Sequence, residues 1–273
     1  MVSYASASSA ATLADLNDRH AGNTVFVVGA GPQLASVFPE HLRQLESQPV
    51  IAVNKVFYRL RPRYFLSAYI GEIMLAIRRI PDATLLHMRP TVADPLLPGI
   101  TAVRRMTFEP GMPLPRRFDA AQPTLLTRLN VALGATHLAY IMGAARIVYL
   151  GVEQRNQLHF WHFDNQCREL IRDDLVLRGD PDVLRIDHSY ASLTHDIEAL
   201  DRPAEDCMQP FYSVDHTPTF AAYFDILRRD GVDIVATTAE SVVADAGARV
   251  VGLDDILATC TITAGRPAGV SPR

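Results

Sequence analysis

The chain has 273 residues, of which 48% are hydrophobic and 21% are charged, and its formal net charge is −4. This composition is typical of a globular protein with a buried core and excludes a disordered chain, and the small negative charge argues against nucleic acid as a partner. The sequence holds three cysteines without CxxC spacing, which favours a reducing compartment. No apolar run reaches the roughly 18 residues of a membrane span. We therefore expect a cytoplasmic protein.

The two ends of the chain differ in composition from the region between them. Residues 1–22 predict a flexible Ser/Ala-rich segment that runs into a short helix, and they lack the basic start and apolar core of a signal peptide. Residues 261–273 predict a disordered tail. Residues 23–260 are expected to form a single α/β domain.

Strands and helices alternate within this domain, which indicates a Rossmann-like, mainly parallel sheet with helices on both faces. Apolar, β-prone runs predict strands at 24–30, 50–56, 63–69, 83–88, 100–106, 145–153 and 232–238. Helical spacing predicts helices at 33–46, with a break before Pro39, and at 71–80, 128–144 and 217–230, with Gly143 and Gly231 as stop signals. A short helix, a strand and a closing helix are expected over 240–259.

Two segments do not follow this alternation. Residues 107–123 contain four prolines, a density that predicts a loop. Residues 154–212 are aromatic, rich in histidine and charged. They predict an irregular lid inserted over a site.

Polar residues follow several of the predicted strands. The ligands of open parallel sheets bind beyond the carboxyl ends of the strands. In this chain those ends are residues 29–33, 54–58, 151–155 and 237–241. The sequence therefore predicts a ligand site where these segments meet.

The first predicted strand ends in the loop Gly29-Ala30-Gly31-Pro32-Gln33. The loop lacks the third glycine of the dinucleotide-binding GxGxxG fingerprint and the Lys-Ser/Thr pair of a phosphate-binding P-loop. Its residues fit a tight turn between strand and helix, and they also fit a loop whose backbone amides face an anionic ligand at a helix N-terminus. The loop alone leaves both interpretations open.

Several blocks, in the same order, resemble the bacterial sialyltransferases that build lipooligosaccharide. They are GAGPQL at 29–34, VNKVFY at 53–58, a helix and strand at 127–153, HFWHFD at 159–164 and a histidine-led helix from 215. The resemblance covers residues 24–245. A related group, the 6-hydroxymethylpterin pyrophosphokinase-like and flagellin-glycosylation proteins, shares much of this pattern.

The resemblance implies roles for single residues. The first loop, with Pro32 and Gln33, and Asn54 after the second strand would hold the cytidine nucleotide of a sugar donor. Arg128 stands at the place of the family's site arginine and would meet a substrate carboxylate. Trp161 stands where the family has a phosphate-contacting tyrosine, and His216 stands where it has the catalytic histidine.

The chain departs from the family at four further positions. Ala30 replaces an asparagine of the first loop, and Asn130 and Val131 replace small hydroxyl residues before the long helix. Arg155 replaces a second phosphate-contacting tyrosine, and it could still hold a phosphate because guanidinium matches phosphate geometry. We include Ala30, Asn130 and Arg155 in the predicted donor site.

His216 and Glu153 also have roles that follow from their own chemistry. His216 begins a predicted helix, whose dipole disfavours the imidazolium form, so it could act as a general base toward an acceptor hydroxyl. It could equally cap the helix or be exposed. Glu153 ends a predicted strand and could bond to a ribose or sugar hydroxyl, or cap the lid.

A metal site is the weaker interpretation of the histidines. His159, His162 and Asp164 could bind zinc, but they have no cysteine partner at useful spacing and no helical HExxH pattern, so we expect them to pack in the lid. We expect no metal, and no cofactor beyond a nucleotide sugar as co-substrate. Magnesium belongs only to an alternative, a pterin- or nucleotide-directed pyrophosphokinase that uses ATP, for which Glu72 is the only carboxylate near the second and third strands.

The sequence therefore predicts a sialyltransferase-like glycosyltransferase that uses a nucleotide-activated sugar, with a CMP-sugar as the expected donor and a glycan or small molecule as acceptor. The resemblance implies direct displacement with inversion. The alternatives are the pyrophosphokinase and a non-catalytic nucleotide-binding protein of the same fold.

Arginines at 104–105 and 116–117 could make peripheral membrane contact or be solvated. The sequence leaves open whether the protein is a homo-oligomer.

Overall fold

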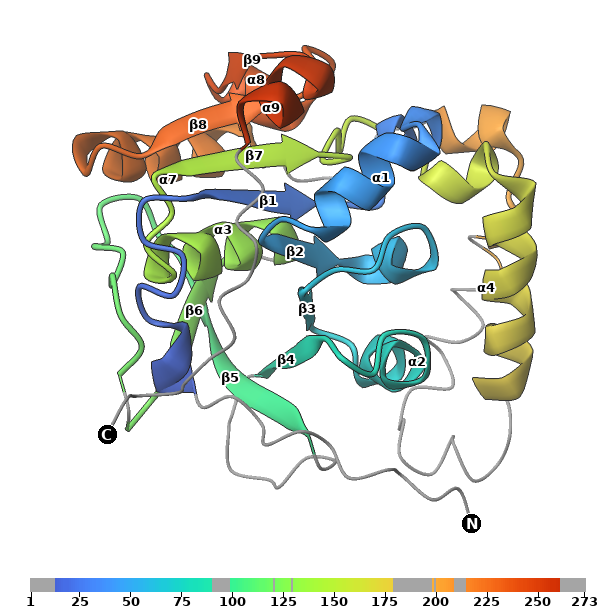
Figure 1. Ribbon diagram of the computed structural model, residues 1–273, viewed down its shortest axis with the longest axis horizontal. Coiled ribbons are helices and arrows are strands. Elements are labelled where there is room, and N and C mark those ends of the chain that lie inside the picture. Colours follow the sequence, from blue (N-terminus) through green and yellow to red (C-terminus); the bar gives the residue numbers. More distant parts are fainter. Residues whose placement is uncertain are drawn as a thin grey trace, which may run out of the picture.

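The computed structural model describes residues 13–89, 99–119, 121–128, 130–178, 198, 200–208 and 215–260. In these residues nine strands form one twisted sheet in the order β6-β5-β4-β3-β2-β1-β7-β8-β9, and all neighbouring strands are parallel (Figure 1). The strands are β1 (Thr24–Val28), β2 (Val50–Val53), β3 (Tyr64–Ser67), β4 (Thr84–Arg89), β5 (Ile100–Thr107), β6 (Thr124–Thr127), β7 (Arg146–Leu150), β8 (Asp233–Ala236) and β9 (Arg249–Val250).

Helices cover both faces of this sheet. One face carries α3 (Val131–Ile141), α7 (Thr217–Arg229) and α8 (Val242–Asp245), and the other carries α1 (Pro39–Glu46), α2 (Ile70–Arg79), α4 (Asn165–Arg178) and α9 (Leu253–Thr259) (Figure 1). Short 3₁₀ helices are η1 (Leu13–Leu16), η2 (Pro32–Ser36), η3 (Asn54–Tyr58), η4 (Phe160–His162) and η5 (Ala204–Met208). The predicted Rossmann-like α/β class, with helices on both faces, is confirmed.

Side chains of β1 divide between two hydrophobic cores. Val25 and Val27 belong to the core under α3 and α7, and Phe26 and Val28 belong to the core under α1 and α2. Successive residues of a strand point to opposite faces, so a strand covered on both faces must be apolar throughout. This burial explains the continuous apolar run that marks the strand in the sequence.

The strand order places a topological switch point between β1 and β7. From β1 the chain moves outward through β2 to β6 at one edge, and then returns to β7 on the other side of β1. Connections on the two sides of β1 therefore diverge, which opens a crevice at the carboxyl ends of these two strands.

The second predicted strand is shorter than expected. Residues 50–56 were expected to be extended, but β2 ends at Val53, because Asn54 has a φ of +58° and begins η3. A left-handed residue cannot continue a strand. The predicted helix at 33–46 is divided into η2 and α1, with the expected break before Pro39.

The strand β6 has no counterpart among the predicted elements. It is a four-residue run directly after Pro123 that pairs with β5 at the edge of the sheet. Such a run is too short to show a period. The helix predicted from residue 128 begins only at Val131, because the Asn130 side chain caps it.

The irregular lid predicted at 154–212 is not confirmed in that form. Its described part contains α4, a helix of 14 residues, together with η4 and η5. Asp164 Oδ1 accepts a hydrogen bond from Cys167 N at 3.0 Å, which is the pattern of a helix cap. Residues 179–197, 199 and 209–212 of the predicted lid lie outside the described residues, as do the terminal segments 1–12 and 261–273. Within the described part of the chain, no helix combines the length and apolar character needed to cross a membrane.

Candidate functional site

Two glycines bring the ends of β1 and β7 together at the switch point. A Cβ on Gly29 would lie 2.4 Å from the Gly151 carbonyl oxygen, and a Cβ on Gly151 would lie 2.4 Å from the Gly29 carbonyl oxygen. Gly31 N donates to the same Gly151 oxygen at 2.8 Å. Because neither position has room for a side chain, glycine is required for this close approach.

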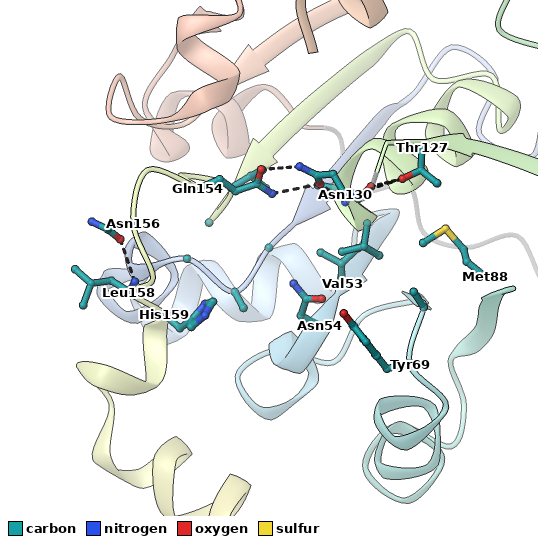
Figure 2. A pocket seen from close by; sticks show the side chains of 18 of the residues that line it. Val53, Asn54, Tyr69, Met88, Thr127, Asn130, Gln154, Asn156, Leu158 and His159 are labelled. Atoms are coloured by element: carbon teal, nitrogen blue, oxygen red, sulfur yellow. Dashed lines mark hydrogen bonds between the residues drawn. The ribbon is translucent and has the colours of Figure 1, made fainter. Parts of the chain in front are cut away.

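A pocket of about 170 Å³ opens beside these glycines. It lies beyond the carboxyl ends of β1, β2, β3 and β7 and at the N-terminus of α3 (Figure 2). Its lining includes residues 29–31, Asn54, Tyr69, Asn130 and His159. The pocket therefore joins segments that are up to 130 positions apart in the sequence, between Gly29 and His159.

Side-chain amides form one wall of the pocket. Asn130 Oδ1 accepts from Ala132 N at 2.9 Å, and Asn130 Nδ2 donates to Gln154 Oε1 at 2.7 Å. Gln154 Nε2 donates back to Asn130 Oδ1 at 3.3 Å (Figure 2). In the described residues, left-handed non-glycine backbone occurs at Asp18, Asn54 and Gln154, and the last two line the pocket. Backbone of this kind concentrates at functional sites.

A neutral aromatic ring forms another part of the lining. The His159 ring stacks on Trp161, with 4.2 Å between ring centroids and 25° between planes. Trp161 is buried behind it, and Lys55 Nζ lies 5.8 Å from the tryptophan ring. Burial, together with the charge of Lys55, lowers the pKa of His159 to about 3. His159 therefore presents an uncharged imidazole to the pocket at neutral pH.

Two half-buried arginines lie at this end of the sheet. Arg105 of β5 lines the pocket, and Arg128 directly follows the lining residue Thr127. Neither arginine forms an ion pair with a carboxylate among the described residues. The described lining contains no Asp or Glu. The pocket is thus suited to a polar ligand that carries negative charge.

The buried side chain of Glu153 contacts the first loop. Its Oε1 accepts from Gln33 N at 3.0 Å, and a Cβ on Gly31 would lie 1.6 Å from its Oε2. The side chain is buried, and this burial raises the pKa of the Glu153 carboxyl. Gly29 N also donates inside the protein, to Leu150 O at 2.8 Å. The amides of Gly29, Gly31 and Gln33 therefore all bond to protein atoms.

His216 lies at the first turn of α7, outside the pocket lining. It is buried, and this burial lowers its pKa, as does the charge of Arg128, while the neighbouring Asp215 raises it. Asp215 Oδ1 accepts from Thr217 N at 2.9 Å and so fixes the start of the helix. Tyr223, further along α7, donates to Leu126 O of β6, which places the helix that His216 begins beside the strand that precedes Arg128.

The side chains of Arg155 and Gln33 form their contacts outside the pocket. Arg155 Nη2 donates to both carboxylate oxygens of Asp245 on α8, at 2.7 and 2.8 Å. The Gln33 side chain donates to Thr237 O at 3.1 Å and accepts from Thr237 Oγ1 at 2.8 Å. These contacts join the ends of β1, β7 and β8 away from the pocket.

The structure brings together only some of the predicted site residues. Gly29, Ala30, Gly31, Asn54 and Asn130 line the pocket, whereas Pro32, Gln33, Arg128, Glu153, Arg155, Trp161 and His216 do not. Sequence reasoning did not identify Tyr69, Arg105, Gln154 and His159 as lining residues. Gln154 and His159 each lie within two positions of a predicted residue, whereas Arg105, inside a predicted strand, carries no signal of its own.

The histidines considered for zinc are not brought together with Asp164. His162 Nε2 lies 3.4 Å from Cys207 Sγ, and Asp164 pairs with Arg59 at 3.2 Å. In the part of the chain that the structure describes, no group of three or more His, Cys, Asp or Glu side chains is arranged to hold a metal ion.

No protein-family model, curated protein or solved structure matches this chain. The parallel α/β fold is therefore known from the structure itself. The motifs and the geometry of the pocket are the features that bear on the protein's function.

Proposed function

We propose that the pocket binds the nucleotide of a nucleotide-activated sugar, and that the protein is a glycosyltransferase whose donor is a CMP-sugar. One observation carries this proposal. Residues 29–31 of the first loop and Asn54, which the motif resemblance assigns to the donor nucleotide, line one pocket together with Asn130, which stands where the family has a small hydroxyl residue, and these residues come from three separate segments. That pocket lies at the switch point, where folds of this class hold nucleotides.

The chemistry of the lining supports a nucleotide. Neutral amides at Asn54, Asn130 and Gln154 can both donate and accept hydrogen bonds, as a pyrimidine edge and a ribose require. Tyr69 and the neutral His159 provide flat rings on which a base can stack. Arg105 supplies the positive charge that a phosphate needs.

The proposed transfer step is a direct displacement. The acceptor oxygen forms a bond to the anomeric carbon while the bond from that carbon to the phosphate oxygen breaks. The bonding electron pair leaves with CMP, and the proton of the acceptor hydroxyl passes to His216. The lowered pKa of His216 favours the neutral imidazole, which is the form that accepts a proton.

Binding is tested by a thermal-shift screen with CMP, CDP, UDP, GDP, ATP with magnesium, and a pterin. A ligand at a hundred times its dissociation constant adds about 2.7 kcal/mol to stability, which gives a measurable shift. We expect a shift with CMP or CDP that does not depend on magnesium. A shift only with magnesium and ATP, or with the pterin, would instead favour the pyrophosphokinase.

Catalysis is tested by His216→Ala. Loss of a general base is expected to slow CMP release from a CMP-sugar roughly 10²- to 10⁴-fold. The matched control is His41→Ala, because His41 lies on α1 and pairs with Asp254 at 3.4 Å, away from the pocket. Unchanged CMP release in His216→Ala would contradict the assignment of the base.

A second candidate is a non-catalytic nucleotide-binding protein of the same fold. The position of His216 outside the pocket lining favours it. Tight CMP binding with no cleavage of any CMP-sugar, and no effect of His216→Ala, would select this candidate.

A further inference from the structure

We infer that Arg105 of β5, and not the first loop, binds the anionic group of the ligand. The ligand then lies across the carboxyl ends of the strands, with its phosphate away from β1. The inference rests on the proposed function, because it takes the ligand to be a nucleotide. It assigns a phosphate-binding residue and the direction in which the nucleotide is bound.

Three amides of the first loop are already occupied. The amides at Gly29, Gly31 and Gln33 donate to protein oxygens, and the one at Gln33 donates to the Glu153 carboxyl. A phosphate at the Gln33 amide would have to displace this buried carboxyl, whose other oxygen fills the space beside Gly31. It would also meet a group that becomes negatively charged when ionised, which repels an anion.

Arg105 lies at the other end of the pocket. Four strand spacings of about 4.8 Å separate β1 from β5 in the sheet, so a ligand that touches both ends extends across several strands. The Arg105 guanidinium has no carboxylate partner among the described residues, and it lines the pocket. A half-buried guanidinium in this state binds a phosphate with charge-assisted hydrogen bonds.

The direction of the ligand also accounts for His216. With the base near the first loop and His159, the phosphate and the sugar attached to it point toward Arg105 and Arg128. Tyr223 of α7 donates to Leu126 O of β6, so the helix that His216 begins packs against the strand that precedes Arg128. The bond that breaks would thus lie at the end of the pocket nearest to the proposed base.

Arg104 is a matched control on the same strand. Adjacent residues of a strand point to opposite faces. Arg104 does not line the pocket, and its Nη1 donates to Gln122 Oε1 at 2.7 Å. The two variants Arg104→Gln and Arg105→Gln therefore remove the same charge from neighbouring positions, with only one of them in the pocket.

The test is a calorimetric titration of each protein with CMP and with cytidine, which lacks the phosphate. We expect Arg105→Gln to weaken CMP binding roughly 10- to 100-fold, as for loss of a hydrogen bond to a charged group, and to leave cytidine binding unchanged. Arg104→Gln is expected to bind both ligands like the wild type. Glu153→Gln, which keeps an acceptor for Gln33 N, is expected to leave the ratio of CMP to cytidine affinity unchanged.

Other outcomes overturn the inference. They are equal losses for CMP and cytidine in Arg105→Gln, no loss in that variant, or a changed affinity ratio in Glu153→Gln. If Arg105→Gln does not fold, Arg105→Lys retains the charge, and it must retain more CMP affinity than Arg105→Met. If the wild type binds neither ligand nor any nucleotide of the screen, the proposed function itself fails, which is distinct from nucleotide binding that ignores Arg105.

Discussion

The carboxyl group of Glu153 occupies the small space beside the first loop that a side chain at position 31 would need. The hydrogen atom of Gly31 leaves room for Glu153 Oε2, and Oε1 of the same carboxyl accepts from Gln33 N at 3.0 Å. The glycine of the motif thus serves an internal contact. A carboxyl supplied by the protein stands at the start of η2, where many nucleotide-binding folds place a phosphate.

Gly31→Ala tests this contact. The added methyl group would overlap Glu153 and is expected to lower the free energy of unfolding by about 1–3 kcal/mol, the usual cost of overpacking. Glu153→Ala removes the obstacle. The double variant is therefore expected to lose much less stability than the sum of the losses of the two single variants. Urea unfolding of the four proteins measures this cycle. Strictly additive costs would show that the two residues do not share the space.

At the scale of elements, a buried ion pair fixes α2 to the ends of β2 and β3. Lys55 Nζ lies 3.5 Å from Glu72 Oε1, and both side chains are buried. Ser67 Oγ donates to Glu72 Oε2 at 2.6 Å and accepts from Tyr69 N at 3.0 Å. Because Lys55 follows Asn54, this network holds two lining residues of the pocket, Asn54 and Tyr69.

Removal of one partner from this pair is expected to be costly. Lys55→Met leaves Glu72 buried without its cation, and we expect a loss of about 3–5 kcal/mol in the free energy of unfolding. The double variant Lys55→Met with Glu72→Leu is expected to recover part of this loss, because no charge is left buried. Chemical denaturation at pH 7 measures both variants. A double variant less stable than either single one would refute the explanation.

At the scale of the whole molecule, buried histidines connect distant segments in their neutral form. His137 on α3 accepts from Leu126 N at its Nδ1, at 2.9 Å, and its Nε2 contacts Pro115 O at 2.8 Å. His20 Nε2 contacts the Tyr64 hydroxyl at 2.8 Å. Burial lowers the pKa of both His20 and His137 to about 4.

These shifts give the stability a definite pH dependence. The unfolded chain binds protons at these histidines below about pH 6.5, whereas the folded protein does so only near pH 4. Stability is therefore fully present above pH 6.5 and is lost as the pH falls toward 4, by up to about 1.4 kcal/mol per pH unit for each histidine. His137→Leu is expected to lower stability at pH 7 but to reduce this slope. Urea midpoints between pH 4 and 7.5 measure it, and an unchanged slope would exclude His137 as a contributor.

The alternation of apolar runs was enough to predict the parallel α/β sheet, because buried parallel strands leave a continuous apolar signal. It was not enough for β6, whose pairing with β5 is decided by tertiary contacts. In the site, Gly29, Gly31, Asn54 and Asn130 were predictable, because glycine loops and strand-end amides are local features. Arg105 was not, because only the placement of β5 distinguishes it from the adjacent Arg104.

The most direct test of the central claim is a crystal structure of the protein grown with CMP. We expect the nucleotide in the pocket, with Asn54 and Asn130 within hydrogen-bond distance of the nucleoside and the phosphate on Arg105. CMP bound outside these lining residues would contradict the proposed site. A phosphate at the Gln33 amide, with Glu153 displaced, would keep the pocket but contradict the direction of binding.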